Sequence, residues 1–346
     1  METNLHEALR IQSIIVPEMM TILFRRYEIL NIISSNEPIG RRNISSLLGL
    51  GEKIVRNEAG FLQEKLLVHI NNRGMCITDK GRKLLEDAES WIYKLRALDD
   101  LGKDLAEVLS VKKVIISFRD TNNRKIIMQE TGKKAAEYLK SIISDDMNIG
   151  ITGGTTMAAT VREMPKFNFN NKNITIIPAR GGLGVDVEIQ ANSIAAILAE
   201  RLNCSYQLLH LTENLSKELL ESLREYPEIK GTMEYIEKID TLIFGIGRAD
   251  VMAERRHLKD SQKKNLNEKG AVAEAFGYYF DEKGKIVDVV NTVGITLEQY
   301  NKLDHIICVA SGIEKASAIR AVSKLNPNLV LIIDEALAKA ILKDSY

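Results

Sequence analysis

Apolar residues near the start of the chain recur at the spacing of short amphipathic helices. Three segments carry this pattern: 25–35, 41–48 and 52–67. Gly49-Leu50-Gly51 separates the last two, and a short helix, a tight turn and a longer helix make the helix-turn-helix pattern. We therefore predict a DNA-binding helix pair in which the longer helix is the recognition helix.

A hairpin pattern follows these helices. Residues 67–70 and 75–78 alternate between apolar and polar side chains around the polar tip 71–74. Such alternation around a short tip with glycine predicts two antiparallel strands. A hairpin after a helix-turn-helix is a wing, so we predict that residues 1–80 form a mainly α winged helix-turn-helix domain.

Apolar positions next recur every seven residues through the proline-free stretch 79–111. The two interleaved sets are Leu84, Trp91, Leu98, Leu105 and Ala88, Leu95, Leu101, Val108. This spacing is typical of a coiled coil, and we predict a helical linker over residues 81–110 that dimerises. The alternative is a helix that packs on the neighbouring domain, and Gly102 within the stripe weakens the coiled-coil seam.

From Val114 onwards, strand-like apolar segments alternate with helical ones. The seven strand segments are 114–118, 147–152, 174–178, 205–209, 241–245, 305–310 and 329–333. This alternation predicts an α/β doubly wound domain with a mainly parallel sheet over residues 111–346. Ligands of such sheets bind at the carboxyl ends of the strands, near a topological switch point.

Composition adds one local signal to this outline. The chain has 346 residues, a length typical of two or three domains. Hydrophobic residues make up 45% of it, which is enough for a large core. Its formal net charge is zero, so the charge of the whole chain does not favour a nucleic-acid partner. Residues 38–83 nevertheless hold nine Lys or Arg against four Asp or Glu, which favours a polyanion at the predicted winged helix.

The cysteines and the hydropathy pattern indicate the compartment. Cys76, Cys204 and Cys308 lie far apart with no Cys-x-x-Cys pair, which is typical of free thiols in a reducing cytosol. The sequence shows no apolar run long enough to cross a membrane and no signal-peptide pattern at Met1. We expect a cytoplasmic protein without a membrane partner.

Gly150–Met157 is the segment with the clearest chemistry. It follows a predicted strand, contains Gly153-Gly154-Thr155-Thr156 and leads into a predicted helix. Glycines let the backbone approach a ligand closely, and the first N–H groups of a helix lack internal partners. A phosphate satisfies these donors and the positive end of the helix dipole. The lysine of a nucleotide P-loop is absent after Gly154, so we expect a different phosphorylated ligand.

Other glycine-bearing segments follow later strands and carry polar side chains suited to a sugar phosphate. They contribute Arg180, Gln190, Arg248, Glu274 and Lys315. Cations suit phosphates, whereas Gln and Glu suit sugar hydroxyls. Each residue alone is weak evidence, because Arg180 also fits a surface ion pair and Glu274 also fits a helix cap. Together they predict a site for an anion that carries hydroxyl groups.

Signals for catalysis are sparse. The five histidines are scattered without metal-ligand spacing, and no Ser-His-Asp or Cys-His arrangement is indicated. Only Glu274 and Asp250 are candidates for the acid or base that a sugar-phosphate enzyme needs. We therefore expect no catalytic residue, no metal and no cofactor.

Basic residues cluster where a winged helix meets DNA. Lys53, Arg56 and Asn57 fall early on the predicted recognition helix, where side chains reach base edges and phosphates. The other candidates are Arg41 and Arg42, which start the preceding helix, and Arg73 at the wing tip. A solvated basic face is the alternative, but the helix-turn-helix geometry favours DNA contact.

The ordered set of these segments resembles the SorC family of bacterial transcription regulators. The segments are Pro38–Arg42, Thr152–Ala159, Pro178–Gly182, Gly245–Asp250, Gly270–Phe280 and Ser311–Ala316. The resemblance spans residues 25–346. It implies a sugar-phosphate isomerase-like effector domain, a DNA-binding N-terminus, dimers or tetramers on operator DNA and a phosphorylated sugar as effector.

The resemblance also implies which residues bind the effector. They are Gly154, Thr155, Thr156, Arg180, Gln190, Arg248, Glu274 and Lys315. In the glycolytic subgroup of the family, the effector is fructose 1,6-bisphosphate, an inducer that relieves repression. Two departures are visible: Gly51 replaces the usual hydroxyl cap of the recognition helix, and Ser117–Asp120 differs from the usual start of the effector domain.

Three functions are compatible with these features. We favour a repressor of glycolytic genes that senses a phosphorylated sugar, with one phosphate at Gly153–Thr156 and Lys315 and another near Arg180 or Arg248. An isomerase or deaminase with an accessory N-terminal domain is the alternative, but it lacks an identifiable acid/base pair. An architectural DNA-binding protein leaves the clustered glycines and cations unexplained.

Overall fold

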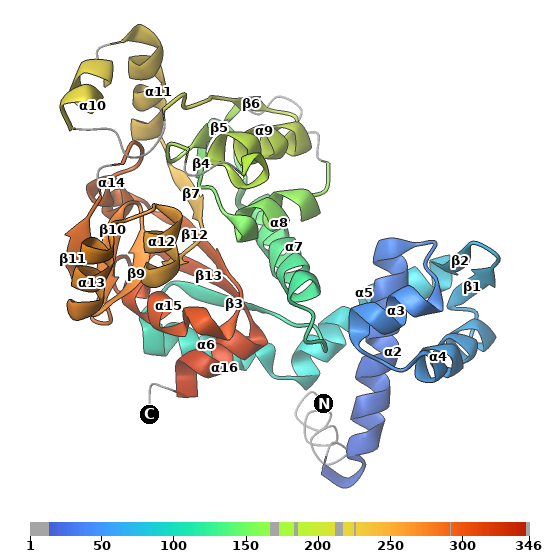
Figure 1. The fold of residues 1–346 in the computed structure, drawn as a ribbon. Helices are drawn as coiled ribbons and strands as arrows, with labels where there is room; N and C mark the ends of the chain where they lie inside the picture. The colour runs from blue at the N-terminus through green and yellow to red at the C-terminus, as the bar shows by residue number, and fades with distance from the viewer. Residues whose placement is uncertain are drawn as a thin grey trace. The chain divides into compact units, whose positions relative to one another are not determined.

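The structure is a computed structural model that describes residues 14–166, 173–182, 186–211, 217–224, 226–290 and 292–343. The chain folds into two compact units, coloured by residue number in Figure 1. The first unit contains the residues up to Asp100 together with Phe118–Ile127, and the second contains Leu101–Ser117 and the residues from Met128 onwards. No helix in the described ranges is both long and apolar enough to cross a membrane.

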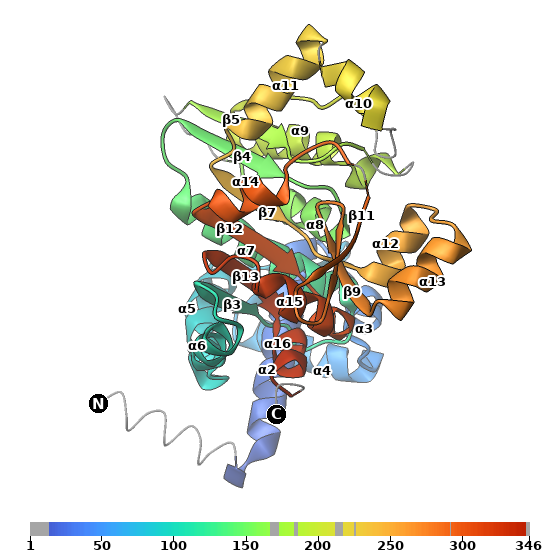
Figure 2. The same ribbon diagram turned by 90° about the vertical axis from the view of Figure 1, so that its left-hand side faces the viewer.

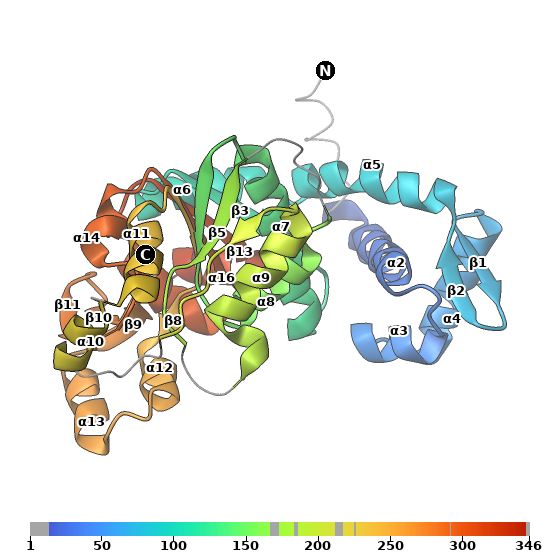
Figure 3. The same cartoon turned by 90° about the horizontal axis from the view of Figure 1, so that it is seen from above.

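The first unit is the predicted winged helix-turn-helix, and its elements can be followed in Figure 3. They are α2 (Pro17–Asn36), α3 (Arg41–Leu48), α4 (Glu52–Glu64), β1 (Val68–Asn71) and β2 (Gly74–Ile77). Gly49 ends α3 with a φ of 66°, a left-handed conformation that favours glycine and turns the chain towards α4. β1 and β2 pair antiparallel and form the wing.

The core of this unit is built from the apolar faces of its three helices. Ile29, Ile44 and Val55, one from each helix, are completely buried. Glu58 of α4 is also buried and accepts ion pairs from Arg25 and Arg26 of α2, both at 2.7 Å. The recognition helix is therefore held to α2 by both apolar packing and paired charges.

The predicted linker contains two helices rather than one. α5 (Asp79–Leu95) ends before Ala97, which has a φ of 49°, and α6 (Leu98–Leu109) begins after it. In the second unit, a Cβ on Gly102 would lie 2.7 Å from the carbonyl oxygen of Val114. Gly102 thus lets α6 pack closely on the sheet, as the alternative interpretation expected. The linker boundaries 81–110 and the other domain limits stay a prediction.

The segment after the first sheet strand belongs to the first unit. Arg119 forms a buried ion pair with Glu28 of α2 at 2.8 Å, and the Asp120 N–H donates to the same carboxylate at 3.0 Å. Ile126 joins the apolar core of the winged helix. Phe118–Asp120, which departs from the family pattern, is therefore a structural part of the DNA-binding unit.

The second unit contains a seven-stranded parallel sheet. Its strands are β3 (Lys113–Ser117), β4 (Met147–Ile151), β5 (Ile174–Pro178), β6 (Ser205–Tyr206), β7 (Thr241–Phe244), β12 (His305–Ala310) and β13 (Leu329–Asp334). They lie in the order β3-β13-β12-β7-β4-β5-β6, and every pairing is parallel. This confirms the predicted α/β doubly wound fold, and all seven predicted strand segments are found.

Helices cover both faces of this sheet (Figure 1). α7 (Arg124–Ile142), α8 (Thr155–Glu163) and α9 (Ala191–Leu202) pack into one apolar core with the strands. The other helices are α10 (Lys217–Arg224), α11 (Pro227–Glu237), α14 (Leu297–Lys302), α15 (Ala316–Ser323) and α16 (Glu335–Lys343), with short 3-10 turns η1 (Val187–Ile189) and η2 (Ile313–Lys315).

A second, antiparallel sheet was not predicted. Its strands lie in the order β11 (Ile286–Val289), β10 (Tyr278–Asp281), β9 (Ala271–Ala275) and β8 (Gly247–Arg248), with α12 (Ala249–Arg255) and α13 (Asp260–Glu268) beside them (Figure 2). Phe276, in the turn between β9 and β10, stacks with Phe244 and Tyr300, both at 5.0 Å between ring centroids. This buried aromatic cluster ties the turn to the parallel sheet.

Candidate effector site

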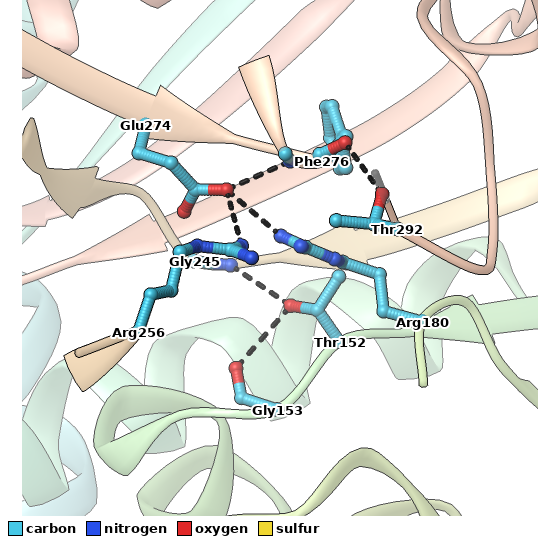
Figure 4. A network of polar contacts seen from close by, with 9 residues as sticks. Thr152, Gly153, Arg180, Gly245, Arg256, Glu274, Phe276 and Thr292 are labelled. Atoms are coloured by element: carbon cyan, nitrogen blue, oxygen red, sulfur yellow. Dashed lines mark hydrogen bonds and ion pairs between the residues drawn. The ribbon is translucent and has the colours of Figure 1, made fainter. Parts of the chain in front are cut away.

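The switch point of the parallel sheet lies between β4 and β7. From β4 the chain proceeds to β5 and β6 on one side, whereas from β7 it proceeds to β12 and β13 on the other. In doubly wound folds, ligands bind at the carboxyl ends of the strands at this point. Thr152 Oγ1 accepts a hydrogen bond from the Gly245 N–H at 3.3 Å, which joins the two loops (Figure 4).

Two glycines shape the loop after β4, for different reasons. A Cβ on Gly153 would lie 2.7 Å from the carbonyl oxygen of Ile189, so only glycine permits this close approach. Gly154 has open space around it, but its φ of 121° and ψ of 159° lie in a region that is essentially restricted to glycine. Its N–H donates to Ile189 at 2.8 Å, so this donor is already used.

The donors of the predicted phosphate cradle therefore start at Thr155, where α8 begins. α8 has no side-chain cap, so its first N–H groups and the positive end of its dipole are not satisfied by a capping side chain. Thr155 is exposed and its hydroxyl is accessible there. Thr156 is buried, and its carbonyl accepts the Thr160 hydroxyl at 3.0 Å. The two threonines are thus not equivalent.

Arg180, Glu274 and Arg256 form a buried charge cluster near the switch point (Figure 4). One oxygen of Glu274 accepts from Arg180 at 3.1 Å, from Arg256 at 2.9 Å and from the Gly277 N–H at 2.7 Å. The Arg256 side chain is fully buried, whereas 11% of the Arg180 side chain is exposed. Of the two guanidinium groups in this cluster, that of Arg180 is the accessible one.

The surroundings of Glu274 keep it ionised. Burial alone raises the pKa of a carboxyl group, but the charges of Arg180 and Arg256 and the Gly277 N–H outweigh it, so the pKa of Glu274 lies below its ordinary value. The sequence suggested that Glu274 lies in a loop after a strand, but it lies inside β9. In this position its carboxylate orients Arg180.

Backbone contacts fix Arg180 and place Gln190 beside the cradle. The backbone of Arg180 bridges to Gly294, whose added Cβ would lie 2.2 Å from the Ala179 carbonyl oxygen. The amide oxygen of Gln190 lies 3.3 Å from the ideal Cβ position of Gly182. Since Gly153 also approaches the start of α9, Gln190 lies at the edge of the loop after β4.

Lys315 and Arg248 differ in where they lie relative to the carboxyl ends of the parallel strands. Lys315 follows β12 at the carboxyl edge of the sheet, in η2. Burial raises the pKa of the Cys308 thiol to about 12, and the nearby Lys315 ammonium acts in the opposite direction. Arg248 instead pairs with Asp250. In the β8–β9 ladder Arg248 lies opposite Ala273 and Glu274 opposite Gly247, so Arg248 projects from the other face.

Arg256 is the residue that sequence reasoning missed. It caps the short helix α12, where a basic residue is ordinarily explained by the helix dipole. Its ion pair with Glu274 joins positions 18 residues apart in different elements, and no sequence spacing signals such a contact. Among the described residues, no group of three or more His, Cys, Asp or Glu side chains is placed to hold a metal ion.

The predicted DNA-contacting residues lie on the surface of the first unit. Lys53, Arg56 and Asn57 are exposed. Because Arg56 and Asn57 follow Lys53 by three and four residues, all three lie on one face of α4. Arg41 and Arg42 are exposed as well and lie 3.8 and 3.6 Å from Glu52, which begins α4. Gly51 caps α4 without a side-chain hydrogen bond, and this confirms the weak cap expected there.

The exposed Arg73 sits at the tip of the wing. Its N–H donates to Asn71 Oδ1 at 2.8 Å, and the same oxygen accepts the Gly74 N–H at 3.1 Å. These bonds fix the turn, so the guanidinium group is presented by an ordered tip.

Comparison with known proteins agrees with both halves of the molecule. Residues 22–92 match the CggR N-terminal DNA binding domain family, and residues 93–343 match a family described as a putative sugar-binding domain. The Central glycolytic genes regulator of Bacillus subtilis is 38% identical over 98% of this chain and 100% of its own length.

Solved structures show the same fold. A putative SorC family transcriptional regulator from Enterococcus faecalis has a TM-score of 0.66 and 34% identity, covering 70% of this chain and 99% of that one. The full-length sorbitol operon regulator SorC from Klebsiella pneumoniae has a TM-score of 0.66 over 94% of this chain and 98% of its own, at 17% identity. These relatives are transcription regulators rather than enzymes, and the chain belongs to the SorC family, with a DNA-binding domain of the CggR type ahead of a sugar-binding domain.

Proposed function

We propose that this regulator represses glycolytic genes and releases its operator DNA when fructose 1,6-bisphosphate binds at the switch point of the parallel sheet. The similarity to the Bacillus subtilis Central glycolytic genes regulator supports the gene class. The observation that carries the ligand class is the uncapped start of α8, which lies at the switch point after Gly153 and Gly154. Such a helix start binds a phosphate group through backbone N–H groups and the helix dipole.

The charge cluster supports an anionic ligand as well. Arg180, Glu274 and Arg256 lie in surroundings that exclude most water. Charge–charge attraction is stronger in such surroundings than in bulk water. A phosphate group suits the Arg180 guanidinium better than a neutral sugar does, because charge-assisted hydrogen bonds are the stronger ones.

A bisphosphate needs two anion sites. We place one phosphate at the start of α8, with Thr155 and Lys315, and the other at Arg180. Arg248 is the weaker candidate for the second site, because its side chain lies on the face of the antiparallel sheet opposite to that of Glu274 and is paired with Asp250. Gln190, at the edge of the loop, is suited to the sugar hydroxyls.

Regulation follows from linkage between the two ligands. An effector that binds more tightly to the arrangement that does not bind DNA shifts the protein away from the operator. A tenfold loss of operator affinity needs a difference of only about 1.4 kcal/mol. On the DNA side we propose that Lys53, Arg56 and Asn57 contact the major groove. Arg41, Arg42 and Arg73 would contact phosphates or the minor groove.

A thermal-shift panel tests this proposal. A ligand present at 100 times its Kd stabilises the folded state by about 2.7 kcal/mol. We expect a rise in Tm with fructose 1,6-bisphosphate and a smaller rise with fructose 6-phosphate, fructose 1-phosphate or other monophosphates. The same ligand should dissociate the protein from glycolytic operator DNA in a mobility-shift assay. No rise in Tm with any sugar phosphate would refute the effector class, and an equal rise with the monophosphates would refute the bisphosphate assignment.

A further inference from the structure

Helix α7 (Arg124–Ile142) is shared by the two compact units of the chain. Residues 124–127 belong to the first unit, and the helix continues without a break into the second unit from Met128 onwards. Different turns of α7 pack in the cores of the two units. Neither the proposed DNA surface nor the proposed phosphate site includes α7, so neither of those functions accounts for how this helix is held.

The start of α7 is built into the winged helix-turn-helix. Ile126 is 4% exposed and belongs to the apolar core of that unit. Asn123, which precedes α7, donates from Nδ2 to the Leu47 carbonyl at 3.2 Å and accepts the Lys125 N–H at 3.1 Å. Leu47 lies in the last turn of α3, ahead of the glycine turn that leads into the recognition helix. The Asn123 side chain therefore ties the first turn of α7 to the helix-turn-helix motif.

In the second unit, α7 crosses α8 in direct backbone contact. A Cβ on Gly132 would lie 3.0 Å from both the Cα and the backbone nitrogen of Thr160, so no side chain separates the two helices at this point. Glycine is the poorest helix former apart from proline, and its place in the interior of α7 is explained by this close approach. Ala135 and Ala136 of α7 belong to the same buried core as Val161 of α8. The two helices are thus packed together without a gap.

α8 is the helix whose start we assign to a phosphate group. Thr160 follows Thr155 by five residues, or about 7.5 Å along the axis of α8. Ile126 precedes Gly132 by six residues, or about 9 Å along the axis of α7. Both helices are continuous over these distances, and close-packed interiors transmit strain. A phosphate that draws the first turn of α8 towards itself would therefore displace α7 at Gly132.

We propose that α7 couples the effector site to the helix-turn-helix motif, and that Gly132 is the position at which α8 acts on it. This coupling rests on the proposed phosphate site at the start of α8. An effector shifts an equilibrium only when it binds one arrangement of the protein more tightly than another. Binding at α8 favours one position of α7, and Ile126 and the Asn123–Leu47 hydrogen bond transmit that preference to the end of α3.

A matched pair of double variants of the full-length protein tests the proposal. Gln129 and Glu130 lie on α7 between Ile126 and Gly132 and outside the proposed phosphate and DNA surfaces. One variant is Gln129→Gly with Glu130→Gly, and the other is Gln129→Ala with Glu130→Ala. Both lose the same side chains, including the hydrogen bond from Gln129 to Glu163 at 3.4 Å. Glycine weakens the helix between the two packed turns, whereas alanine strengthens it.

Fluorescence anisotropy on operator DNA, with and without saturating fructose 1,6-bisphosphate, gives the factor by which the effector weakens operator binding. We expect a factor of about tenfold or more in the wild type and the alanine variant, and a factor that approaches one in the glycine variant. Calorimetry without DNA should show that the glycine variant binds the effector as tightly as the wild type or more tightly. Circular dichroism checks that both variants are folded, and the single substitutions Gln129→Gly and Gln129→Ala replace the double ones if the glycine variant is not.

Three outcomes would overturn the proposal. A folded glycine variant that keeps the full wild-type factor would mean that α7 is not required for the response. An alanine variant that loses the factor as well would mean that the side chains of Gln129 and Glu130, rather than the continuity of the helix, account for the loss. A wild type that does not bind fructose 1,6-bisphosphate in calorimetry would refute the proposed effector and the coupling with it, whereas the first two outcomes leave the effector site intact.

Discussion

Glu274→Gln removes the negative charge from the buried cluster and leaves two guanidinium groups close together. Glu274 holds Arg256 at 2.9 Å and Arg180 at 3.1 Å, and the Arg256 side chain is fully buried. Removing one partner of a buried ion pair costs about 3–5 kcal/mol. For a protein of this size 1 kcal/mol shifts Tm by about 2–4 °C, so we expect a fall of about 6–20 °C.

The same substitution separates two roles for Glu274. If Glu274 contacts Arg180 and not the ligand, the Gln side chain can still accept a hydrogen bond from Arg180. The variant then has one negative charge fewer near the site and should bind a sugar phosphate as tightly as the wild type or more tightly. If Glu274 instead binds a sugar hydroxyl, the lost bond costs about 1.5–3 kcal/mol, or roughly 10- to 150-fold in Kd. Calorimetric titration with fructose 1,6-bisphosphate measures this difference.

The control is Glu298→Gln, which removes the same charge from an exposed pair with Lys302. Exposed pairs contribute little, so its Tm should stay close to that of the wild type. An unchanged Tm in Glu274→Gln would refute the buried-cluster argument. A weaker Kd with an unchanged Tm would show that Glu274 contacts the ligand directly.

The pH dependence gives a second readout of the same cluster. Burial raises the pKa of Glu274, but Arg180, Arg256 and the Gly277 N–H lower it further, so in the folded protein it lies below the ordinary 4.5. A lowered folded-state pKa stabilises the protein above pH 4.5, and this stabilisation is lost as pH falls through the folded-state value. The Tm difference between wild type and Glu274→Gln should therefore be full at neutral pH and shrink in acid.

Three further substitutions test the other sites. Gly154→Ala should lower Tm, because the backbone conformation of Gly154 alone costs an alanine about 1–3 kcal/mol. The control Gly231→Ala, in the interior of α11, should raise Tm slightly, and equal Tm shifts in the two variants would contradict the strain argument. Thr155→Glu should abolish sugar-phosphate binding in calorimetry while Thr155→Ser retains it, and retained binding in Thr155→Glu would place the phosphate elsewhere. Arg56→Ala should weaken operator binding and reduce the slope of log K against log salt concentration by about one, while the Kd for the effector stays unchanged. Full operator affinity in this variant would show that Arg56 does not contact DNA.

The parallel sheet was predictable because its strands are buried on both faces. β12 and β13 are continuous apolar runs, and such runs are visible in a sequence without any partner information. The antiparallel sheet was not predictable in the same way. β9 is Ala271–Ala275, a run of weak strand formers between two glycines, and it resembled a turn after a strand.

The sequence predicted which loops form the effector site, but not which side chains form ion pairs within it. The glycines and Thr155 of the cradle follow from local rules for strand-to-helix turns. The position of Arg256 depends on how α12 packs against β9, which is tertiary information. The linker is a different case: the seven-residue spacing continues from Trp91 of α5 to Leu98 of α6 across the turn at Ala97. Leu98 and Leu105 are nevertheless buried within the single chain, which needs no coiled coil.

The location of Phe118–Ile127 makes the DNA-binding unit discontinuous along the chain. A fragment that ends at residue 92, where the DNA-binding family match ends, lacks Arg119 and Ile126. Glu28, which is 1% exposed, would then lose its ion pair with Arg119, and breaking a buried ion pair costs about 3–5 kcal/mol out of a typical stability of about 5–15 kcal/mol. An isolated winged helix that is stable therefore has to carry residues from beyond the linker, joined to it by an artificial loop.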